Sequence, residues 1–329
     1  MKAAYYEQTG PAAEVIIVGD LEDPSPAAGE VLVEIATSAV NPSDAKTRAG
    51  ARGPIAYDRV IPHSDGAGRI VAVGEGVSEE RIGERVWLWN AAWKRPHGAN
   101  STLVALPGEQ AVFLPDEASY EAGACLGIPA LTAHRCLFAD GPVAGQTILV
   151  TGGAGMVGSY AIQMAKLAGA TVLTTVSSEE KAVHARKMGA DIVLNYREQD
   201  VAEAILEATV GRGVERIVEV EFGGNLPISR KVLAQNGTIA AYGSMADPEP
   251  ALPFYPMMFD GQTVRMVLVY VLPQVARDAG IKDINRWLEA GALQHPVART
   301  FPLENTADAH QFVETGAKIG ATIVKVSDL

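Results

Sequence analysis

The sequence predicts an α/β protein in which a doubly wound parallel sheet is joined to a β-rich domain. Apolar strands alternate with amphipathic helices across residues 146–293, which is typical of a parallel sheet covered by helices on both faces. The first third of the chain is rich in strands and shows little helical periodicity. The strand–helix–strand tail at 296–326 has no sheet of its own, so we expect it to fold back onto the β-rich domain.

In the β-rich domain, alternating and β-branched residues predict strands at 30–40, 68–74 and 84–89, between glycine and proline residues. Helical periodicity then runs through 119–138 and is interrupted at Pro129. Because the tail joins this part, we expect the β-rich domain to comprise residues 1–124 and 294–329. Residues 125–293 are left for the parallel-sheet domain.

The parallel-sheet domain is predicted from a repeated strand–helix unit. Its first strand, glycine turn, first helix and second strand fall within residues 146–176. Further helices are expected at 179–188, 201–208, 226–233 and 284–293, and further strands at 191–196, 216–222, 238–243 and 264–271.

Composition and charge exclude several functions. With 39 acidic and 27 basic residues, the 329-residue chain carries a net charge of −12, which disfavours nucleic-acid binding, and no basic cluster suits a membrane surface. No apolar run could span a bilayer, and the first residues lack the apolar core of a signal peptide, so we expect a cytoplasmic enzyme. Cys125 and Cys136 lie in apolar surroundings and are expected to be buried thiols.

The segment "GAGMVG" carries the pattern Gly-x-Gly-x-x-Gly between an apolar strand and a helix. This context predicts a dinucleotide-binding (Rossmann) turn, in which Gly153 permits the tight turn, Gly155 admits the pyrophosphate and Gly158 allows close helix packing. The helix N-terminus would offer N–H groups and its dipole to the phosphates. The other residues of this turn are Ala154, Met156 and Val157. The alternative is a tight turn that binds no ligand.

The residues after the second strand of this unit favour NADPH over NADH. NAD enzymes commonly carry an acidic residue there, which binds the ribose 2′-hydroxyl. Here Ser177 and Ser178 leave room for a 2′-phosphate, and Lys181 would neutralise it. Glu179 and Glu180 argue against this interpretation, but Ser177 and Glu180 have capping-box spacing, so helix capping is their expected role.

Five segments together cover most of the chain with recognisable motifs: "VLVEIATSAVNPSDAKTRAG", "GIPALTAHRCL", "VTGGAGMVGSYAIQMAKLAGA", "LNYRE" and "HQFVETGAKIGATIVKV". In these motifs the chain resembles the medium-chain dehydrogenase/reductase superfamily, and within it the zinc-independent quinone oxidoreductase (zeta-crystallin-like) branch. The resemblance implies that the β-rich domain is a GroES-like catalytic domain and that the other is a Rossmann domain.

The resemblance also bears on a metal site. Zinc-dependent members of the superfamily hold a catalytic zinc with Cys, His and Cys, and the resemblance puts Asn41, Ser64 and Ile128 at those positions. Catalytic zinc requires three nitrogen, sulfur or carboxylate ligands, so no metal site is expected. His63, which precedes Ser64 in "HSDGAG", is expected to be a loop residue at the inner surface of the domain, with proton transfer as the alternative.

The activity that the resemblance implies is hydride transfer from NADPH to a quinone or similar conjugated carbonyl, whose oxygen hydrogen bonds would stabilise. Asn41 is the candidate to hold that carbonyl, and a turn-forming Asn before Pro42 is the alternative. Lys46 replaces a tyrosine usual in the branch and would contact cofactor or substrate oxygen, unless it is simply exposed. The rival functions are a 2-enoyl or alkenal double-bond reductase and a non-catalytic NADPH-binding redox sensor or crystallin-like protein.

Further cofactor contacts follow from the resemblance alone. Thr132 would bind the nicotinamide carboxamide and Tyr196 would border the adenine, with core packing as the alternative for both. Asn225, Gly243 and Ser244 would line the ribose and diphosphate, and Val269, Tyr270 and Val271 would flank the nicotinamide. Glu219 and Glu221 are either proton-relay groups or ordinary acids at a strand end.

The segment "VRMVLVYVL" predicts an assembly. So apolar a strand near the edge of a sheet needs to be covered. In this superfamily two such edges often pair, so we expect a homodimer.

Overall fold

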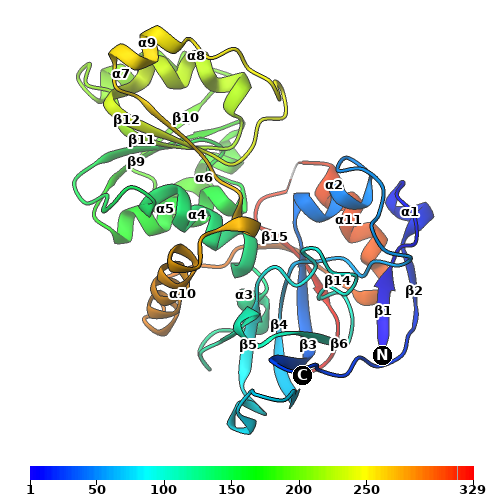
Figure 1. The fold of residues 1–329 in the computed structure, drawn as a ribbon. Helices are drawn as coiled ribbons and strands as arrows, with labels where there is room; N and C mark the ends of the chain where they lie inside the picture. The colour runs from blue at the N-terminus through cyan, green and yellow to red at the C-terminus, as the bar shows by residue number, and fades with distance from the viewer. Residues whose placement is uncertain (317) are drawn as a thin grey trace. The chain divides into compact units, whose positions relative to one another are not determined.

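The computed structural model describes residues 1–316 and 318–329. It divides into two compact units (Figure 1), each with its own sheet. Unit 1 comprises Met1–Ile128 and Ile281–Leu329, and unit 2 comprises Pro129–Gly280.

Unit 2 is built on a six-stranded parallel sheet with the strand order β10-β9-β8-β11-β12-β13. The strands are β8 (Thr147–Val150), β9 (Thr171–Val176), β10 (Ile192–Asn195), β11 (Val214–Glu219), β12 (Leu233–Ala241) and β13 (Thr263–Met266). The order reverses between β8 and β11, and ligands of such sheets bind where the carboxyl ends of those two strands diverge. The predicted doubly wound sheet is therefore confirmed.

Helices connect these strands and complete the core of unit 2. They are α4 (Leu131–Phe138), α5 (Met156–Leu167), α6 (Glu179–Lys187), α7 (Val201–Ala208), α8 (Phe222–Val232) and α9 (Phe254–Phe259). Leu149, Ile217 and Ile239 of the sheet pack against Ile205 of α7 and Leu226 of α8. Burial of each such side chain contributes about 1.5–3 kcal/mol to folding, so the apolar strands account for the stability of the sheet.

Unit 1 is built on a seven-stranded sheet with the order β14-β15-β3-β4-β5-β7, in which β6 also pairs with β3. The strands are β3 (Glu30–Val40), β4 (Asp65–Val73), β5 (Arg85–Leu88), β6 (Leu103–Pro107), β7 (Ala111–Phe113), β14 (Val297–Pro302) and β15 (Ala321–Lys325). β15 runs antiparallel to β3, with Thr322 opposite Val40, so the tail does return to this sheet as expected. Val33, Ile35, Ile70 and Val86 form the centre of the core.

Smaller elements complete unit 1. The helices are α1 (Ala12–Val15), α2 (Pro42–Arg48), α3 (Tyr120–Gly123) and α11 (Thr306–Glu314), and β1 (Lys2–Tyr5) pairs with β2 (Ile17–Asp20). The predicted helix at 119–138 is interrupted as expected, by a turn of π-helix at Leu126–Ala130 that contains Pro129. No helix of the described residues is both long and apolar enough to cross a membrane.

Helix α10 (Gln274–Glu289) begins and ends earlier than the predicted 284–293 and contains Gly280. A Cβ at Gly280 would lie 2.9 Å from Leu131 Cδ2 of α4, so this glycine permits close packing rather than ending the helix. The helix also crosses the boundary between the units. Its Asn285 accepts a hydrogen bond from Trp87 Nε1 (3.1 Å) and donates one to the Phe113 carbonyl (3.2 Å), which ties its second half to unit 1. The units therefore divide at 128/129 and 280/281, not at the expected 124/125 and 293/294.

Two other elements differ from the prediction. The strand expected at 264–271 is only Thr263–Met266, and the chain then turns through a short 3-10 segment at Val269–Val271. Helix α8 begins at Phe222 rather than 226, because it accommodates Pro227 inside instead of starting beside it.

Candidate cofactor and carbonyl sites

The glycine turn lies between β8 and α5 and has the geometry of a phosphate-binding turn. A Cβ at Gly153 would lie 2.1 Å from Thr174 Oγ1, and one at Gly158 would lie 2.4 Å from the Gly152 carbonyl, so both positions require glycine. At Gly155 the nearest atom would be 3.4 Å away, and this residue is exposed. The Gly155 N–H donates to the Gly152 carbonyl at 3.0 Å, so Gly153 is a central residue of this turn, and Gly152 has the positive φ of 69°.

The N-terminus of α5 is open to an anion. Its N-cap is Gly155, which has no side chain to satisfy the first N–H groups, and no acidic residue lies in the first turn. Met156 and Val157 of that turn are half-buried, whereas Ala154 is packed inside. The free N–H groups and the helix dipole therefore fit a pyrophosphate.

At the carboxyl end of β9 the structure brings Ser177, Ser178 and Lys181 together. Lys181 Nζ donates to Ser177 Oγ at 3.1 Å. Ser178, not Ser177, is the N-cap of α6, and its side chain accepts from the Lys181 N–H, which corrects the expected capping box. Glu179 forms an exposed ion pair with Arg186 at 2.7 Å and so leaves this end of the helix to the hydroxyls and the lysine.

The end of β11 carries two acids, and both are engaged in local hydrogen bonds. Glu219 is fully buried and accepts from Thr151, Asn225, Ser229 and the Glu221 N–H. Burial raises the pKa of its carboxyl, against the effect of these donors. Glu221 caps α8 and accepts from the N–H groups of Met245 and Ala246. These contacts favour strand-end acids over proton-relay groups.

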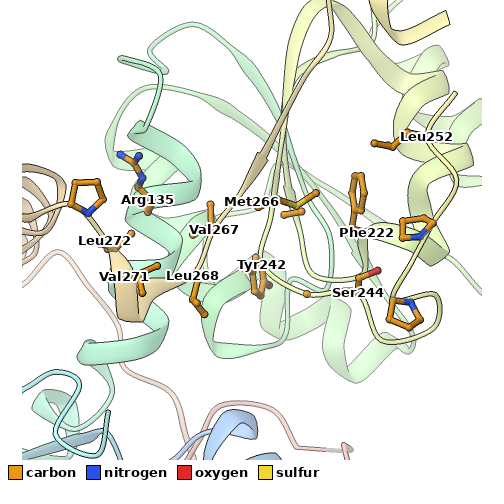
Figure 2. Close-up of a pocket in the computed structure, with 15 residues that line it drawn as sticks. Arg135, Phe222, Tyr242, Ser244, Leu252, Met266, Val267, Leu268, Val271 and Leu272 are labelled. Atoms are coloured by element: carbon orange, nitrogen blue, oxygen red, sulfur yellow. The ribbon is translucent and has the colours of Figure 1, made fainter. Parts of the chain in front are cut away.

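A pocket of about 620 Å³ lies beyond β12 and β13, within unit 2 (Figure 2). Its lining is mainly apolar and includes three of the expected cofactor residues, Gly243, Ser244 and Val271. Ser244 Oγ accepts from the Gly223 N–H at 2.9 Å, so its hydroxyl holds the start of α8. Val269 and Tyr270 are buried beside Val271, which is 59% exposed.

Two further expected cofactor contacts lie in different surroundings. Thr132 is buried within α4. Tyr196 follows β10 and is 53% exposed, so core packing does not explain it.

In unit 1, Asn41 lies between β3 and α2 and is the N-cap of that helix. Its backbone N–H donates to Asp44 Oδ2 at 2.8 Å, and its side-chain Nδ2 donates to Asp65 Oδ2 at 2.8 Å. The Ile128 N–H donates to the same Asp65 oxygen at 3.0 Å. Asp65 is fully buried, and its Oδ1 has no hydrogen-bond partner among the described residues. Asp65 therefore links two of the three positions that the resemblance equates with zinc ligands.

Both acids beside Asn41 have raised pKa values. Burial raises the pKa of Asp65 well above its ordinary value, with a smaller contribution from the nearby charge of Asp44. Burial also raises the pKa of Asp44 to about 7, against hydrogen bonds from the backbone of Asn41 and Ser64. The sequence reasoning missed both acids, although "HSDGAG" and "VNPSD" place each next to a residue that it singled out.

The residues at the expected zinc positions do not fit a catalytic zinc site. Asn41 uses its amide to bind Asp65, Ser64 is a buried hydroxyl, and Ile128 has an apolar side chain. No group of three or more His, Cys, Asp or Glu side chains within 1–316 and 318–329 could hold a metal ion. Cys125 and Cys136 are separate buried thiols, whose pKa values burial raises to about 12.

Two lysines of unit 1 differ in their surroundings. Lys46 lies in α2, two residues after Asp44, and is half-buried. Lys318, which the sequence reasoning missed, donates from Nζ to Thr322 Oγ1 at 3.2 Å. Burial lowers the pKa of Lys318 to about 8.

His63 is not at an inner surface but fully buried, with φ at 75°. Its Nδ1 lies 2.9 Å from Ser38 Oγ, and its Nε2 lies 3.0 Å from His310 Nε2 of α11. Burial lowers the pKa of both rings, that of His310 to about 3. His63 therefore joins α11 to the sheet of unit 1 as a neutral ring.

Comparisons with known proteins agree with a Rossmann-like unit 2 and a GroES-like unit 1. Residues 27–116 match the family of alcohol dehydrogenase GroES-like domains, and residues 156–282 match the zinc-binding dehydrogenase family. The quinone oxidoreductase of Mus musculus is 30% identical over 327 residues, which are 97% of this chain and 96% of that protein. The chain belongs to the quinone oxidoreductase (zeta-crystallin-like) branch of the medium-chain dehydrogenase/reductase superfamily. It is thus a member of a family of oxidoreductases with a Rossmann-like and a GroES-like domain.

Other relatives within this superfamily differ in what their names state. A 2-haloacrylate reductase of Burkholderia sp is 29% identical over 333 residues, with 98% of each chain covered. The solved structure of Escherichia coli quinone oxidoreductase complexed with NADPH has a TM-score of 0.87 and 25% identity, and covers 99% of this chain and 100% of its own. An NAD-dependent alcohol dehydrogenase structure has a TM-score of 0.89 and 27% identity, over 99% of this chain and 100% of its own. The oxidoreductase class is therefore shared, whereas substrate and cofactor vary.

Proposed function

We propose that the protein is an NADPH-dependent reductase that transfers a hydride to a quinone or similar conjugated carbonyl. The observation that carries this proposal is the group Ser177, Ser178 and Lys181 beside the open phosphate-binding turn, since Lys181 already donates to Ser177 at 3.1 Å. A 2′-phosphate would accept hydrogen bonds from both hydroxyls and the ammonium. The quinone oxidoreductase relatives support the choice of acceptor.

The cofactor, when bound, supplies the hydride. The backbone N–H groups of Met156, Val157 and Gly158 would hold its pyrophosphate at the start of α5, and Gly155, which has no side chain, would admit it. Thr132, Tyr196, Asn225, Gly243, Ser244 and residues 269–271 remain proposed contacts for its other parts.

Asn41 is proposed to hold the carbonyl oxygen of the acceptor. Its NH2 group has two N–H donors, and Asp65 takes one of them at 2.8 Å. The Asn41 side chain also hydrogen bonds to Asp44, so the carbonyl would take this second donor over from Asp44, and the donor would stabilise the negative charge that develops on the substrate oxygen. Lys46 is proposed as a cationic contact for cofactor or substrate oxygen, and the proton would come from water or a nearby donor. Because the donor set around Asn41 does not suit zinc, we propose that the reaction is zinc-independent.

A double-bond reductase is the second candidate, favoured by the similarity to a 2-haloacrylate reductase. Reduction of such an alkene also delivers hydride to a carbon conjugated with a carbonyl, so the same amide could serve both. The two acceptors differ in that a quinone can be reduced in one-electron steps, whereas an alkene conjugated to a carboxylate is reduced by hydride.

The experiment that tests the proposal is stopped-flow NADPH oxidation by the purified protein against a panel of quinones, alkenals, enones and 2-haloacrylate. Turnover with quinones is expected, and NADPH should be preferred to NADH. Replacement of Lys181 by Met should reduce that preference about tenfold, since one charge-assisted contact is lost. Binding of NADPH without turnover of any acceptor would instead indicate a non-catalytic sensor or crystallin-like role.

We also propose a homodimer formed at the edge strand β13. Met266 of β13 is 67% exposed and Leu268 beyond it is 46% exposed. On α9, which precedes β13 in the chain, Phe254 and Phe259 are 66% and 76% exposed, so several large apolar side chains of β13 and α9 are in contact with water. Water contact with such a surface is unfavourable, and a second copy would cover it. Light scattering should give twice the mass of one chain, and a monomeric mass at micromolar concentration would contradict the proposal.

A further inference from the structure

The carboxylate of Glu219 is buried at the point where the strand order of unit 2 reverses. Glu219 is the last residue of β11, and β11 pairs with β8, whose end leads into the glycine turn. The side chain is 0% exposed and forms no salt bridge within the described residues 1–316 and 318–329. Burial of a carboxyl without a salt bridge costs folding free energy unless hydrogen bonds satisfy its oxygens, so the donors around Glu219 determine whether it can be buried here.

Four donors surround this carboxyl and divide unequally between its two oxygens. Oε1 accepts from Thr151 Oγ1 (2.7 Å), the Glu221 N–H (2.8 Å) and Asn225 Nδ2 (2.8 Å). Oε2 accepts from Ser229 Oγ (2.9 Å). The backbone N–H of Glu221 can only donate, so Oε1 is an acceptor whether or not the carboxyl carries a proton.

The orientation of Asn225 follows from this arrangement. Because Oε1 accepts, the NH2 group of Asn225 must face Glu219, and the amide oxygen must face the other way. Asn225 is half-buried, and its Oδ1 has no hydrogen-bond partner within the part of the chain that the structure describes. The site therefore presents an unused acceptor in a fixed direction.

The same carboxyl also fixes the place of that acceptor relative to the glycine turn. Thr151 directly precedes Gly152 of the turn, and its Oγ1 both lies 2.7 Å from Glu219 and accepts from the Val220 N–H at 2.9 Å. Glu219 thus connects the end of β8 with the first turns of α8. Since both of its oxygens are occupied and none of the side chain is exposed, it cannot act as a proton shuttle to solvent.

We infer that Glu219 is a positioning residue of the cofactor site, which holds Asn225 so that its amide oxygen accepts from a donor on the bound dinucleotide. This inference rests on the proposed NADPH function. Asn225 is proposed above as a contact of the ribose and diphosphate, and the hydrogen-bond donors next to these groups are the hydroxyls of the nicotinamide ribose and the NH2 group of the carboxamide.

The experiment measures NADPH affinity by fluorescence titration and stability by thermal unfolding without ligand. Asn225→Ala should weaken NADPH binding about tenfold, which is the effect of one lost hydrogen bond to a polar ligand. Glu219→Leu alone should also weaken NADPH binding about tenfold. In the double variant with Asn225→Ala it should cause no further loss of affinity, because Glu219 acts on the cofactor only through Asn225. The matched control is Ser229→Ala, which removes a donor to Glu219 on the side away from Asn225 and should lower stability while it leaves NADPH affinity within twofold.

A second pair of variants covers the case in which Glu219→Leu does not fold. Asn225→Asp places an acceptor against Oε1 and should weaken NADPH binding at least tenfold by turning the side chain away. Glu219→Gln keeps an oxygen that accepts from the Glu221 N–H and from Asn225, and it turns its NH2 toward Ser229 Oγ, so it should leave NADPH affinity within about twofold. Equal NADPH affinity in wild type, Asn225→Ala and Asn225→Asp would overturn the inference.

The analogue 3-acetylpyridine adenine dinucleotide phosphate, reduced, identifies the donor, since it has a methyl ketone in place of the carboxamide NH2. If Asn225→Ala weakens NADPH but not the analogue, the donor is the carboxamide, and if it weakens both, the donor is a ribose hydroxyl. Failure of the wild-type protein to bind NADPH would instead contradict the proposed function.

Discussion

In each unit of the molecule, an asparagine side chain donates a hydrogen bond to a buried carboxyl, but the two carboxyls accept different numbers of hydrogen bonds. Glu219 accepts four hydrogen bonds from Thr151, Asn225, Ser229 and the Glu221 N–H, and both of its oxygens have donors. Asp65 accepts from Asn41 and Ile128 on one oxygen only. A Cβ at Gly127 would lie 2.3 Å from Asp65 Oδ1, so the backbone encloses the other oxygen.

This difference indicates how each asparagine is held. Glu219 has enough donors to offset much of the cost of burial, whereas burial raises the pKa of Asp65 well above its ordinary value, against only two such donors. We therefore expect burial to favour the neutral form of Asp65. Asn41 is then oriented by a neutral group, in a site that would stabilise negative charge on a substrate.

The largest expected effect comes from removal of the Asp65 carboxyl. Asp65→Ala leaves the Asn41 NH2 and the Ile128 N–H without their buried acceptor, so the free energy of unfolding should fall by about 3 kcal/mol. Urea denaturation at pH 7 measures this change. Asp65→Asn is the control, because it keeps an acceptor and has the same charge as a protonated acid. It should cost less than about 1 kcal/mol, and an equal loss in both variants would contradict a neutral Asp65.

A comparison of the two asparagines is expected to separate turnover from binding. Asn41→Ala should lower kcat with a quinone about 100-fold, the usual effect of losing one donor to a developing oxyanion, and leave the Kd for NADPH unchanged. Steady-state kinetics and NADPH titration of the same preparation measure both. The opposite result, a weakened Kd with unchanged kcat, would assign Asn41 to cofactor binding.

The sequence predicted several of the elements but not these pairings. The apolar pattern of 30–40 predicted β3 with its observed bounds, and the glycines of "GAGMVG" predicted the turn before α5. Asn41 meets Asp65, 24 residues away, because β3 pairs with β4 so that Ala39 lies opposite Asp65. Thr151 and Glu219 are 68 residues apart and meet because β8 lies beside β11. Strand order and register determine such contacts, and a single sequence does not specify them.

Removal of metal ions tests whether the Asn41 site uses zinc, and it should leave the rate of quinone reduction unchanged. Incubation with EDTA is expected to leave quinone turnover unchanged, since Asn41, Ser64 and Ile128 do not provide a zinc ligand set. Elemental analysis of the untreated protein should find less than about one zinc per ten chains, and one zinc per chain together with loss of activity in EDTA would contradict zinc independence.

The smallest expected effect is the pH dependence of stability that comes from Asp44, which accepts from the Asn41 N–H in unit 1. Burial raises the pKa of Asp44 from 3.8 to about 7, so between these values the folded state binds more protons than the unfolded state. Its contribution to stability is therefore present at low pH and is lost as pH rises from about 4 to 7, at up to about 1.4 kcal/mol per pH unit.

Urea denaturation of wild type and Asp44→Asn isolates this contribution. The amide keeps an oxygen to accept from the Asn41 N–H and does not titrate in this range. Both proteins retain His63 and His310, whose lowered pKa values reduce stability as pH falls below 6.5, so that opposite trend cancels in the difference. Wild type should lose stability relative to Asp44→Asn as pH rises from 4 to 7, whereas a constant difference would mean that Asp44 is ionised throughout this range.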